Sequence, residues 1–348
     1  MRVVLADPPA YTPPYDHELA AALARAGAEV ELVTAPFRFG IRPQPQGYEL
    51  HETFYRAASR SAALRLPLKA LDHPLSMARL LRRRADVLHV QWVGVPEIDV
   101  VLLRPRAPLV FTAHDLVPRR TARRAGLWRR LFSRFDRVVV HSERGRARLE
   151  RFGVRPARLR VIPHPVFRSD PPRRDDGATV LALGVIRPYK GLADAVTAVG
   201  RAPDARLLVA GDPRIPLTDL RRAAGNRAEW RLGYLDRAEL QRALSDATIA
   251  IFPYLDELDQ SGALLEALGA GVPAVVYDVG GLGEVVHRFS AGRVVAPGDV
   301  EGLTAAIDVL LGDGAALAAA RRGAERAREE LTWGAAAEAH LSLYRELV

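Results

Sequence analysis

The stretch TIAIFPYLDELDQSGALLEALGAGVPAVVY, residues 248–277, contains two short apolar runs separated by a polar loop and a helical pattern. The helical pattern covers Ser261–Ala270, and Gly271 and Pro273 mark its end and the start of the second apolar run. Continuous apolar runs of this length are typical of strands that are buried on both faces of a parallel sheet. The stretch therefore predicts a strand, a helix and a second, parallel strand.

The same alternation runs through both halves of the chain. Strands are expected at Val3–Ala6, Val30–Thr34, Val87–Val90, Pro108–Ala113 and Val138–His141, and then at Thr179–Leu183, Arg206–Ala210, Thr248–Phe252, Ala274–Tyr277 and Arg293–Val295. Helices are expected at His17–Ala26, Arg123–Arg134, Glu143–Phe152, Leu192–Arg201, Arg237–Ser245, Ser261–Ala270 and Val300–Leu311. This order predicts an α/β protein of two doubly wound, Rossmann-like domains that face each other across a cleft.

A polar, proline-rich stretch separates the two halves. Residues 169–178 read SDPPRRDDGA, which is typical of a linker. We therefore expect a first domain over residues 1–168 and a second over residues 179–331, with a helical segment over residues 332–348.

Composition narrows the class of protein. The chain has 348 residues, 49% of them hydrophobic, and contains no cysteine, which excludes a disulfide framework, a thiolate metal site and a cysteine nucleophile. The beginning of the sequence does not have the pattern of a signal peptide, and no run of about 18 apolar residues occurs. A cytoplasmic protein is the expectation.

The positive charge is concentrated in the first half. The net charge is +9, with fifteen arginines and three acids over residues 119–160, and eight basic residues and one acid over residues 55–84. Such a concentration of positive charge attracts phosphates. Peripheral contact with the inner surface of an anionic membrane is therefore one expectation. Leucines at helical spacing accompany the second window: Leu64, Leu68, Leu71 and Leu75. Pro67 and Pro74 weaken this helix, and solvated helix faces are the alternative interpretation. Nucleic acid is a weaker partner, because no zinc-finger or RNA-recognition motif occurs.

Two motifs of the second half have the chemistry of a phosphate site. In GVIRPYKG, residues 184–191, Arg187 and Lys190 follow a strand and can neutralise a diphosphate, although they could also be two solvated charges. In the second motif, Ser261-Gly262-Ala263 begins a helix whose first N–H groups can bind an anion. Glu266 lies about one turn further on, where it could accept hydrogen bonds from ribose hydroxyls. A plain helix cap and a surface residue are the alternatives.

A third motif, DVGGLGE at residues 278–284, completes the series. Together the three motifs resemble the nucleotide-sugar-binding domain of GT-B glycosyltransferases, in particular the retaining family 4. The resemblance rests on the following residues: Gly184, Lys190-Gly191, Gly211, Gly233-Tyr234, Pro253-Tyr254, Glu266, Gly271-Val-Pro273 and Asp278–Glu284. Two positions depart from the family pattern, since Leu258 stands where a first glutamate is common and Val185 stands where an arginine is common.

The resemblance implies a metal-independent transfer of a sugar from a nucleoside-diphosphate donor, UDP-, GDP- or ADP-linked, to a glycan or lipid-linked hydroxyl group. No cofactor besides the donor is implied. Gly184, Gly211, Gly233, Tyr234, Ser261, Gly262, Ala263 and Glu266 would bind the donor together with Arg187 and Lys190, which would also act in catalysis. The last helices would cross back onto the first domain.

The resemblance also assigns residues to the sugar and acceptor side. His114 would approach the donor sugar and support the transition state, and the residues around the sugar and acceptor would be Tyr15, Asp16, Asp115, Glu257 and Asp259. The loop Pro8–His17 would line the cleft. His89 is more typical of a core residue, and His141 of a neighbour of a helix cap. No metal site is expected. An epimerase of the same architecture and a non-catalytic nucleotide-binding module are the alternatives.

Overall fold

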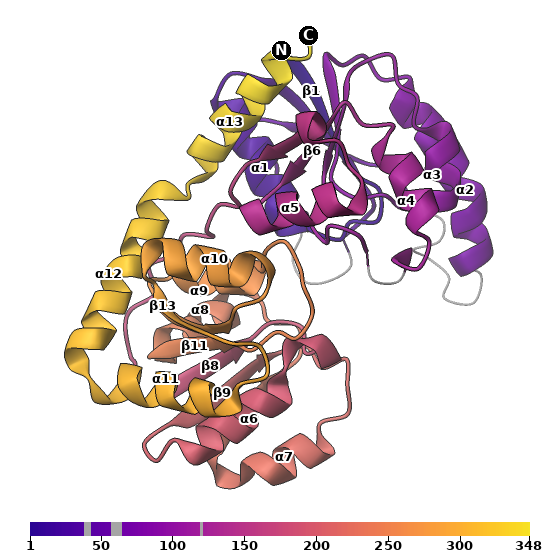
Figure 1. Cartoon of the computed structure of the whole chain (residues 1–348). Helices are drawn as coiled ribbons and strands as arrows, with labels where there is room; N and C mark the ends of the chain where they lie inside the picture. The colour runs from indigo at the N-terminus through magenta and orange to yellow at the C-terminus, as the bar shows by residue number, and fades with distance from the viewer. Residues whose placement is uncertain (38–42, 57–64, 119–120) are drawn as a thin grey trace. The chain divides into compact units, whose positions relative to one another are not determined.

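The computed structural model describes the chain except residues 38–42, 57–64 and 119–120 (Figure 1). It divides into two compact units: Met1–His164 together with Trp333–Val348, and Pro165–Thr332. The expected linker is therefore part of the second unit. Its Ser169 N–H donates to the carbonyl of Gly269, at 3.0 Å, and its Arg173 guanidinium donates to the carbonyl of Gly271, at 2.6 Å.

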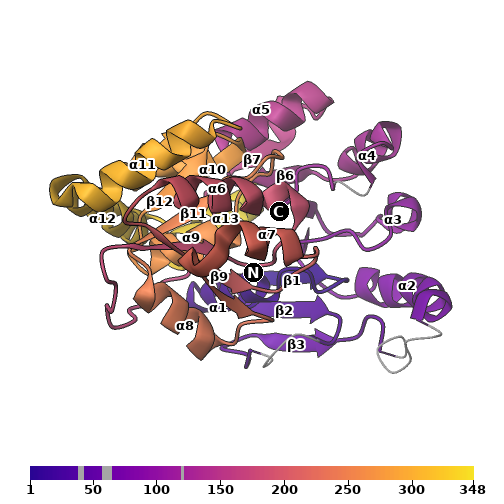
Figure 2. The same ribbon diagram turned by 90° about the horizontal axis from the view of Figure 1, so that it is seen from below.

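The first unit is built on a seven-stranded parallel sheet with the order β3-β2-β1-β4-β5-β6-β7. Its strands are β1 (Arg2–Asp7), β2 (Glu29–Thr34), β3 (Glu49–Glu52), β4 (Val87–Val90), β5 (Leu109–Thr112), β6 (Arg137–Val140) and β7 (Leu159–Val161). Its helices are α1 (Pro13–Arg25), α2 (Arg65–Leu81), α3 (Pro96–Leu102), α4 (Ala125–Phe132), α5 (Glu143–Phe152) and α13 (Trp333–Arg345). Figure 2 shows β1, β2 and β3 side by side at one end of this sheet.

The second unit is built on a six-stranded parallel sheet with the order β10-β9-β8-β11-β12-β13. Its strands are β8 (Thr179–Leu183), β9 (Arg206–Gly211), β10 (Ala228–Leu232), β11 (Ile249–Phe252), β12 (Ala274–Tyr277) and β13 (Gly292–Val295). Its helices are α6 (Leu192–Arg201), α7 (Thr218–Ala224), α8 (Arg237–Asp246), α9 (Gly262–Gly269), α10 (Gly280–Phe289), α11 (Val300–Gly312) and α12 (Gly314–Glu330).

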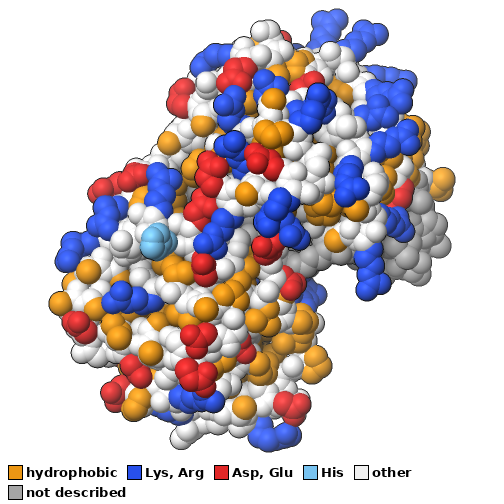
Figure 3. Space-filling view, in the orientation of Figure 1, with side chains coloured by type: hydrophobic (Ala, Val, Ile, Leu, Met, Phe, Trp, Pro, Cys, Tyr) orange, Lys and Arg blue, Asp and Glu red, His pale blue; other side chains and the backbone are white. Residues whose placement is uncertain are grey.

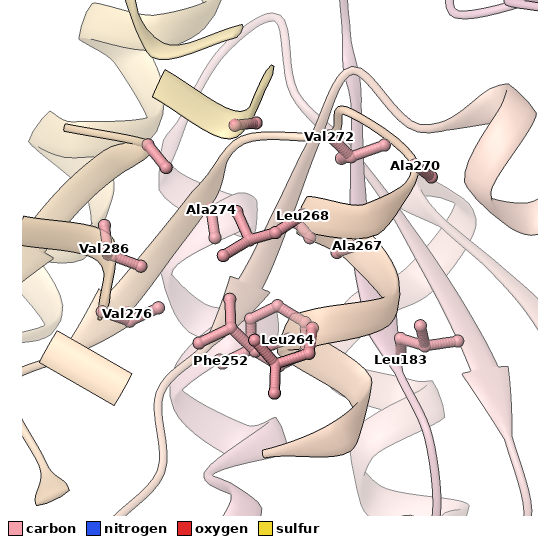
Figure 4. Packing of buried hydrophobic residues seen from close by; sticks show 14 of the residues in the cluster. Leu183, Phe252, Leu264, Ala267, Leu268, Ala270, Val272, Ala274, Val276 and Val286 are labelled. Carbon is pink, nitrogen blue, oxygen red and sulfur yellow. The ribbon is translucent and has the colours of Figure 1, made fainter. Parts of the chain in front are cut away.

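Each sheet is buried on both faces, which explains the continuous apolar runs. In the second unit, successive residues of β8 enter different cores: Val180 packs with α6 and α11, and Leu181 packs with α8 and α9. Figure 4 shows the second of these cores, where Phe252 and Leu264 lie against each other. The architecture confirms the expected α/β fold with two doubly wound units.

The helix α13 is part of the first unit's core, although it is far from the rest of that unit in the sequence. It packs against α1, and the hydroxyl of the fully buried Tyr344 is hydrogen-bonded to Nδ1 of His89, at 2.6 Å. The other ring nitrogen of His89 lies 2.7 Å from the hydroxyl of Thr112. His89 is therefore a satisfied core histidine, as the sequence indicated.

The strands that the sequence did not predict are β3, β7 and β10, and all three lie at sheet edges. An edge strand has fewer buried positions, so the sequences ELHE, LRV and AEWRL lack a continuous apolar run. The helix α2 forms although it contains Pro67 and Pro74. Pro67 lies in the first turn, where the missing N–H has no intrahelical acceptor.

Among the described residues, no single helix combines the length and the apolar composition of a membrane span. Within the described ranges, one bent pair of helices, α11 and α12, passes that test when taken together, and the two meet at an angle of 98°.

Candidate functional site

Three glycines shape the carboxyl ends of β8, β9 and β10. Gly211 has a φ of +152°, and a Cβ atom there would lie 2.0 Å from the carbonyl oxygen of Gly184. Gly184 itself has a φ of +101°, and the N–H of Gly233 donates to the carbonyl of Gly211, at 3.1 Å. Only glycine fits at position 211. The three strand ends carry no side chains at this edge of the sheet, so backbone or a ligand can approach it closely.

The basic turn after β8 is fixed by a second close approach. Residues Pro188–Lys190 form a single 3₁₀ turn that ends at Gly191, whose φ is +64°. A Cβ atom on Gly191 would lie 1.9 Å from the carbonyl oxygen of Pro253, at the end of β11. The turn is therefore held against the neighbouring strand end, where parallel sheets bind their ligands.

Lys190 and Arg187 occupy different environments in this turn. The Lys190 ammonium lies 5.0 Å from the centre of the Tyr254 ring and 3.2 Å from the point where a Cβ atom on Gly184 would be. The Arg187 side chain is exposed and forms no ion pair or hydrogen bond with any other described residue. The Lys190 ammonium is thus positioned over the glycines at the strand ends, and the Arg187 guanidinium is available to bind an anion.

The helix α9 begins beside this turn. The Ser261 hydroxyl caps the helix by accepting from the N–H of Leu264, at 3.4 Å, and lies 3.1 Å from the Tyr254 hydroxyl. Across the described residues, the N–H groups of Gly262 and Ala263 have no acceptor. Packing does not require glycine at position 262, because a Cβ atom there would meet only the Phe167 ring, at 4.0 Å. The first turn of α9 is open to an anion.

We call the group of Gly184, Lys190, Tyr254, Ser261 and the first two N–H groups of α9 the cradle. A small recess of the surface is lined by Gly184, Lys190, Pro253 and Tyr254. The cradle is positively charged, and its glycines allow a ligand to approach the backbone closely. Its hydrogen-bond donors come from two strand ends and from the start of one helix. Such a set of donors suits a diphosphate group.

Other residues expected to bind the donor lie further out. The Glu266 carboxylate lies in the second turn of α9, 3.8 Å from the Arg237 guanidinium of α8. Tyr234 follows Gly233 and is about half exposed, and burial of the rest raises the pKa of its phenol. In the loop before α9, Glu257 is exposed, whereas Asp259 is fully buried and lies away from solvent.

In the first unit, the side chains at the carboxyl ends of the strands form an aromatic cluster around Tyr15. His114 follows β5, His141 follows β6 and His164 follows β7. The Tyr15 ring centre lies within 6 Å of four ring centres, at the following distances: His114 4.7 Å, His164 4.9 Å, Trp333 5.2 Å and His141 5.6 Å. Trp92 stacks on His114 with a centroid distance of 5.4 Å.

The hydrogen bonds of this cluster determine where the protons of two histidines lie. His141 Nδ1 lies 2.9 Å from the carbonyl oxygen of Ile162, so Nδ1 carries the hydrogen and Nε2 is an acceptor. His114 Nδ1, 3.4 Å from that Nε2, must then donate, which leaves His114 Nε2 with a lone pair. The Gln91 Oε1 atom lies 3.1 Å from this Nε2, so a lone pair here requires the Gln91 amide to be turned until its NH₂ group faces the ring.

This proton arrangement makes His114 a neutral, doubly hydrogen-bonded ring. Burial and the neighbouring His141 lower the pKa of His114 well below its usual range, which disfavours the imidazolium. Its lone pair is already occupied by Gln91. The geometry therefore supports positioning of a substrate by His114 more than removal of a proton. Asp115, expected beside it, follows in the same loop and is partly exposed.

The prediction of a loop over residues 8–17 is wrong for the second half of this segment, because α1 begins at Pro13. Proline is favoured in the first turn of a helix, and two prolines occur here. Tyr15 and Asp16 are consequently buried, each 2% exposed, and do not line a loop. They contribute to the cluster and to a buried pair of carboxyl groups instead.

The carboxyl pair consists of Asp7, at the end of β1, and Asp16, both nearly inaccessible to solvent. Burial raises the pKa of Asp7 to about 6, although the N–H groups of Tyr11 and Thr12 donate to it. Burial and the Asp7 charge raise the pKa of Asp16 well above its usual range. The folded pair therefore holds a proton to higher pH than the same carboxyl groups in the unfolded chain.

We expect Asp16→Asn to raise the midpoint of thermal unfolding at pH 8 by about 2–4 °C. Because both folded pKa values are raised, the pair favours folding below about pH 4 and loses this effect as pH rises through about 6. The substitution removes one of the like charges. Glu18→Gln, an exposed change on the same helix, is the control. An equal change at pH 4.5 and pH 8 would contradict this.

The described part of the chain contains no group of three His, Asp or Glu side chains placed to hold a metal ion. The residues that sequence reasoning missed are Gln91, Trp92, His164 and Trp333. Gln91 and Trp92 directly follow the expected strand Val87–Val90, so the rule that ligands lie at strand ends could have identified them.

Two family profiles match the chain, one on each half. "Glycosyltransferase Family 4" matches residues 15–168, and "Glycosyl transferases group 1" matches residues 177–313. The chain is 35% identical over 183 residues to the glycogen synthase of Mycobacterium tuberculosis, a match that covers 49% of this chain and 43% of the relative. It is 28% identical over 243 residues to the phosphatidyl-myo-inositol mannosyltransferase of Mycolicibacterium smegmatis, which covers 66% of this chain and 62% of that one. The chain thus spans less than two thirds of these relatives.

Solved structures share the fold over the whole chain. The sucrose-phosphate synthase of Thermosynechococcus elongatus matches with a TM-score of 0.76 and 22% identity, covering 100% of this chain and 99% of that one. The HepE protein of Anabaena, solved in complex with UDP and glucose, matches with a TM-score of 0.72 and 17% identity, covering both chains fully. At these identities the likeness concerns the fold.

Proposed function

The chain belongs to the family 4 glycosyltransferases of the GT-B fold, and from this we propose that it moves a sugar from a nucleoside-diphosphate donor to a hydroxyl group of a glycan or lipid-linked acceptor. The donor is UDP-, GDP- or ADP-linked, no metal takes part, and the configuration at the anomeric carbon is retained. Relatives named as glycogen synthase and as mannosyltransferase support this substrate class.

The observation that carries the proposal is the cradle. In the reaction, the bond from the anomeric carbon to the diphosphate oxygen breaks, and a bond to the acceptor oxygen forms. The acceptor's proton passes to the departing diphosphate. The negative charge that develops on the diphosphate is stabilised by Lys190, Arg187 and the first N–H groups of α9. Asp259 is excluded from direct contact by its burial.

We further propose that the acceptor is held at a membrane surface on the cytoplasmic side. Leu71 and Leu75 lie one turn apart on α2 and are 71% and 60% exposed. Arg79 and Arg82 lie close to them in the sequence, at the end of that helix and just after it. Exposed leucines among basic residues are typical of a helix that lies on an anionic lipid surface. A relative named for phosphatidyl-myo-inositol supports this class of acceptor.

A thermal-shift panel of UDP, GDP and ADP tests the nucleotide site. We expect one of the three to stabilise the protein by about 2.7 kcal/mol at a hundredfold excess over its Kd, because it binds only the folded state. Lys190→Ala should remove most of this shift. Arg242→Ala, which changes an exposed arginine of the same unit, should leave it intact. If no nucleotide shifts the wild-type midpoint, the donor assignment is refuted.

A further inference from the structure

A groove of about 520 Å³ opens on the first unit at the amino ends of β1 and β4. Five arginines and one acid contribute to its lining: Arg2, Arg82, Arg83, Arg84, Arg106 and Asp86. These residues begin β1, follow α2, and precede β4 and β5. The groove therefore lies at the opposite edge of the sheet from His114, and neither the cradle nor the aromatic cluster shares a residue with it.

Two of the arginines are fixed in place by one buried carboxylate. Glu31, whose side chain is 5% exposed, accepts from Arg2 at 2.7 Å and also from Arg83. Burial alone would raise the pKa of Glu31, but these hydrogen bonds outweigh it and lower that pKa. Asp86 is also engaged, since its carboxylate accepts from the N–H of Arg2, at 2.7 Å. The acids near the groove already have partners.

The other three arginines are uncompensated. Arg82, Arg84 and Arg106 are exposed, and within the described ranges none of them has an ion-pair or hydrogen-bond partner. Some exposed arginines elsewhere meet acids, as Arg146 meets Glu150 on α5, and others, such as Arg187, do not. Figure 3 shows Lys and Arg side chains at many points of the surface, so the groove is distinguished by the hollow that gathers five arginines.

We propose that this groove is a second anion site, which takes a small ligand that carries two or more phosphate groups. A volume of 520 Å³ is within the range of small-molecule sites, and a hollow suits a discrete ligand better than a flat surface. Guanidinium groups bind phosphate oxygens in pairs, so three free and two fixed arginines can hold more than one phosphate. The six residues of β1 span roughly 20 Å, which separates this ligand from the reacting groups at the other edge.

The test measures binding of sodium tripolyphosphate by isothermal titration calorimetry at 150 mM NaCl. It uses the Arg187→Ala/Lys190→Ala protein, so that the cradle does not contribute. We expect one saturable site in this protein. Adding Arg82→Ser, Arg84→Ser and Arg106→Ser should weaken binding at least tenfold. A matched control adds Arg25→Ser, Arg130→Ser and Arg155→Ser, three exposed arginines of the same unit outside the groove, and should change affinity less than threefold.

Two results would overturn the proposal: no saturable binding before the groove is changed, or equal losses in the groove and control variants. Circular dichroism confirms that each variant folds. Competition by phosphatidylglycerol vesicles distinguishes the two sources of the phosphate. Vesicles that displace tripolyphosphate assign the groove to a lipid headgroup, and vesicles that leave it bound assign the groove to a free anion.

Discussion

Replacing Arg187 and Lys190 together with alanine should lower the rate of sugar transfer by at least about a thousandfold. The two cations are expected to stabilise the charge that develops on the diphosphate, and one lost donor of this kind costs a factor of about 100 to 1,000. Release of the nucleoside diphosphate from the donor that the thermal-shift panel identifies gives the rate.

The fold should survive this double substitution. Arg187 is exposed and Lys190 is half-buried, and neither side chain belongs to either hydrophobic core of the second unit. Surface changes of this kind usually alter the free energy of unfolding by less than about 0.5 kcal/mol. Arg242→Ala together with Arg322→Ala, two exposed arginines of the same unit, is the control and should retain the wild-type rate. A wild-type rate in the Arg187/Lys190 variant would refute the phosphate clamp.

His114→Ala should lower kcat about a hundredfold and leave nucleotide affinity nearly unchanged. We infer that the ring positions the donor sugar, whereas the nucleotide contacts lie in the second unit. Since the pKa of His114 is well below its usual range, activity should show no transition from this ring between pH 6 and 8. A wild-type kcat in the variant would remove His114 from the site.

Gln91→Glu tests the proton arrangement that holds this ring. A carboxylate at this position accepts hydrogen bonds only, so it would face the lone pair of His114 Nε2 and favour the imidazolium. Nitrogen chemical shifts of the His114 ring should therefore change from the neutral Nδ1–H form to the doubly protonated form near neutral pH. Gln91→Met, which has a similar volume and no such charge, should keep the ring neutral. A neutral ring in both variants would contradict the assignment.

The central strands could be predicted from the sequence because burial on both faces leaves a continuous apolar run. The helices Glu143–Phe152 and Leu192–Arg201 were predicted to the residue. Three of the four edge strands could not be, since a half-exposed strand such as Ala228–Leu232 mixes apolar and charged residues, whereas the edge strand β13 was expected at Arg293–Val295. The start of α1 was missed because Pro13 and Pro14 were interpreted as loop residues, although the first turn of a helix tolerates proline.

The cradle follows from sequence more directly than the aromatic cluster does. Its glycines and Lys190 lie at the ends of recognisable strands, and parallel strands bring such ends to one edge. The contacts of His114 depend on how far each neighbouring loop extends beyond its strand. Sequence spacing does not specify that His141 and Gln91 would meet the two nitrogens of one ring, or that Tyr15 would be buried among them.

The last helix imposes an order on biosynthesis. Tyr344 and Leu341 of α13 complete a core whose other members, such as Val3 and Leu19, leave the ribosome more than three hundred residues earlier. The second unit is continuous, so it can finish folding while the first still exposes the apolar surface that α13 will cover. Until translation reaches that helix, the nascent first unit is a natural client for chaperones.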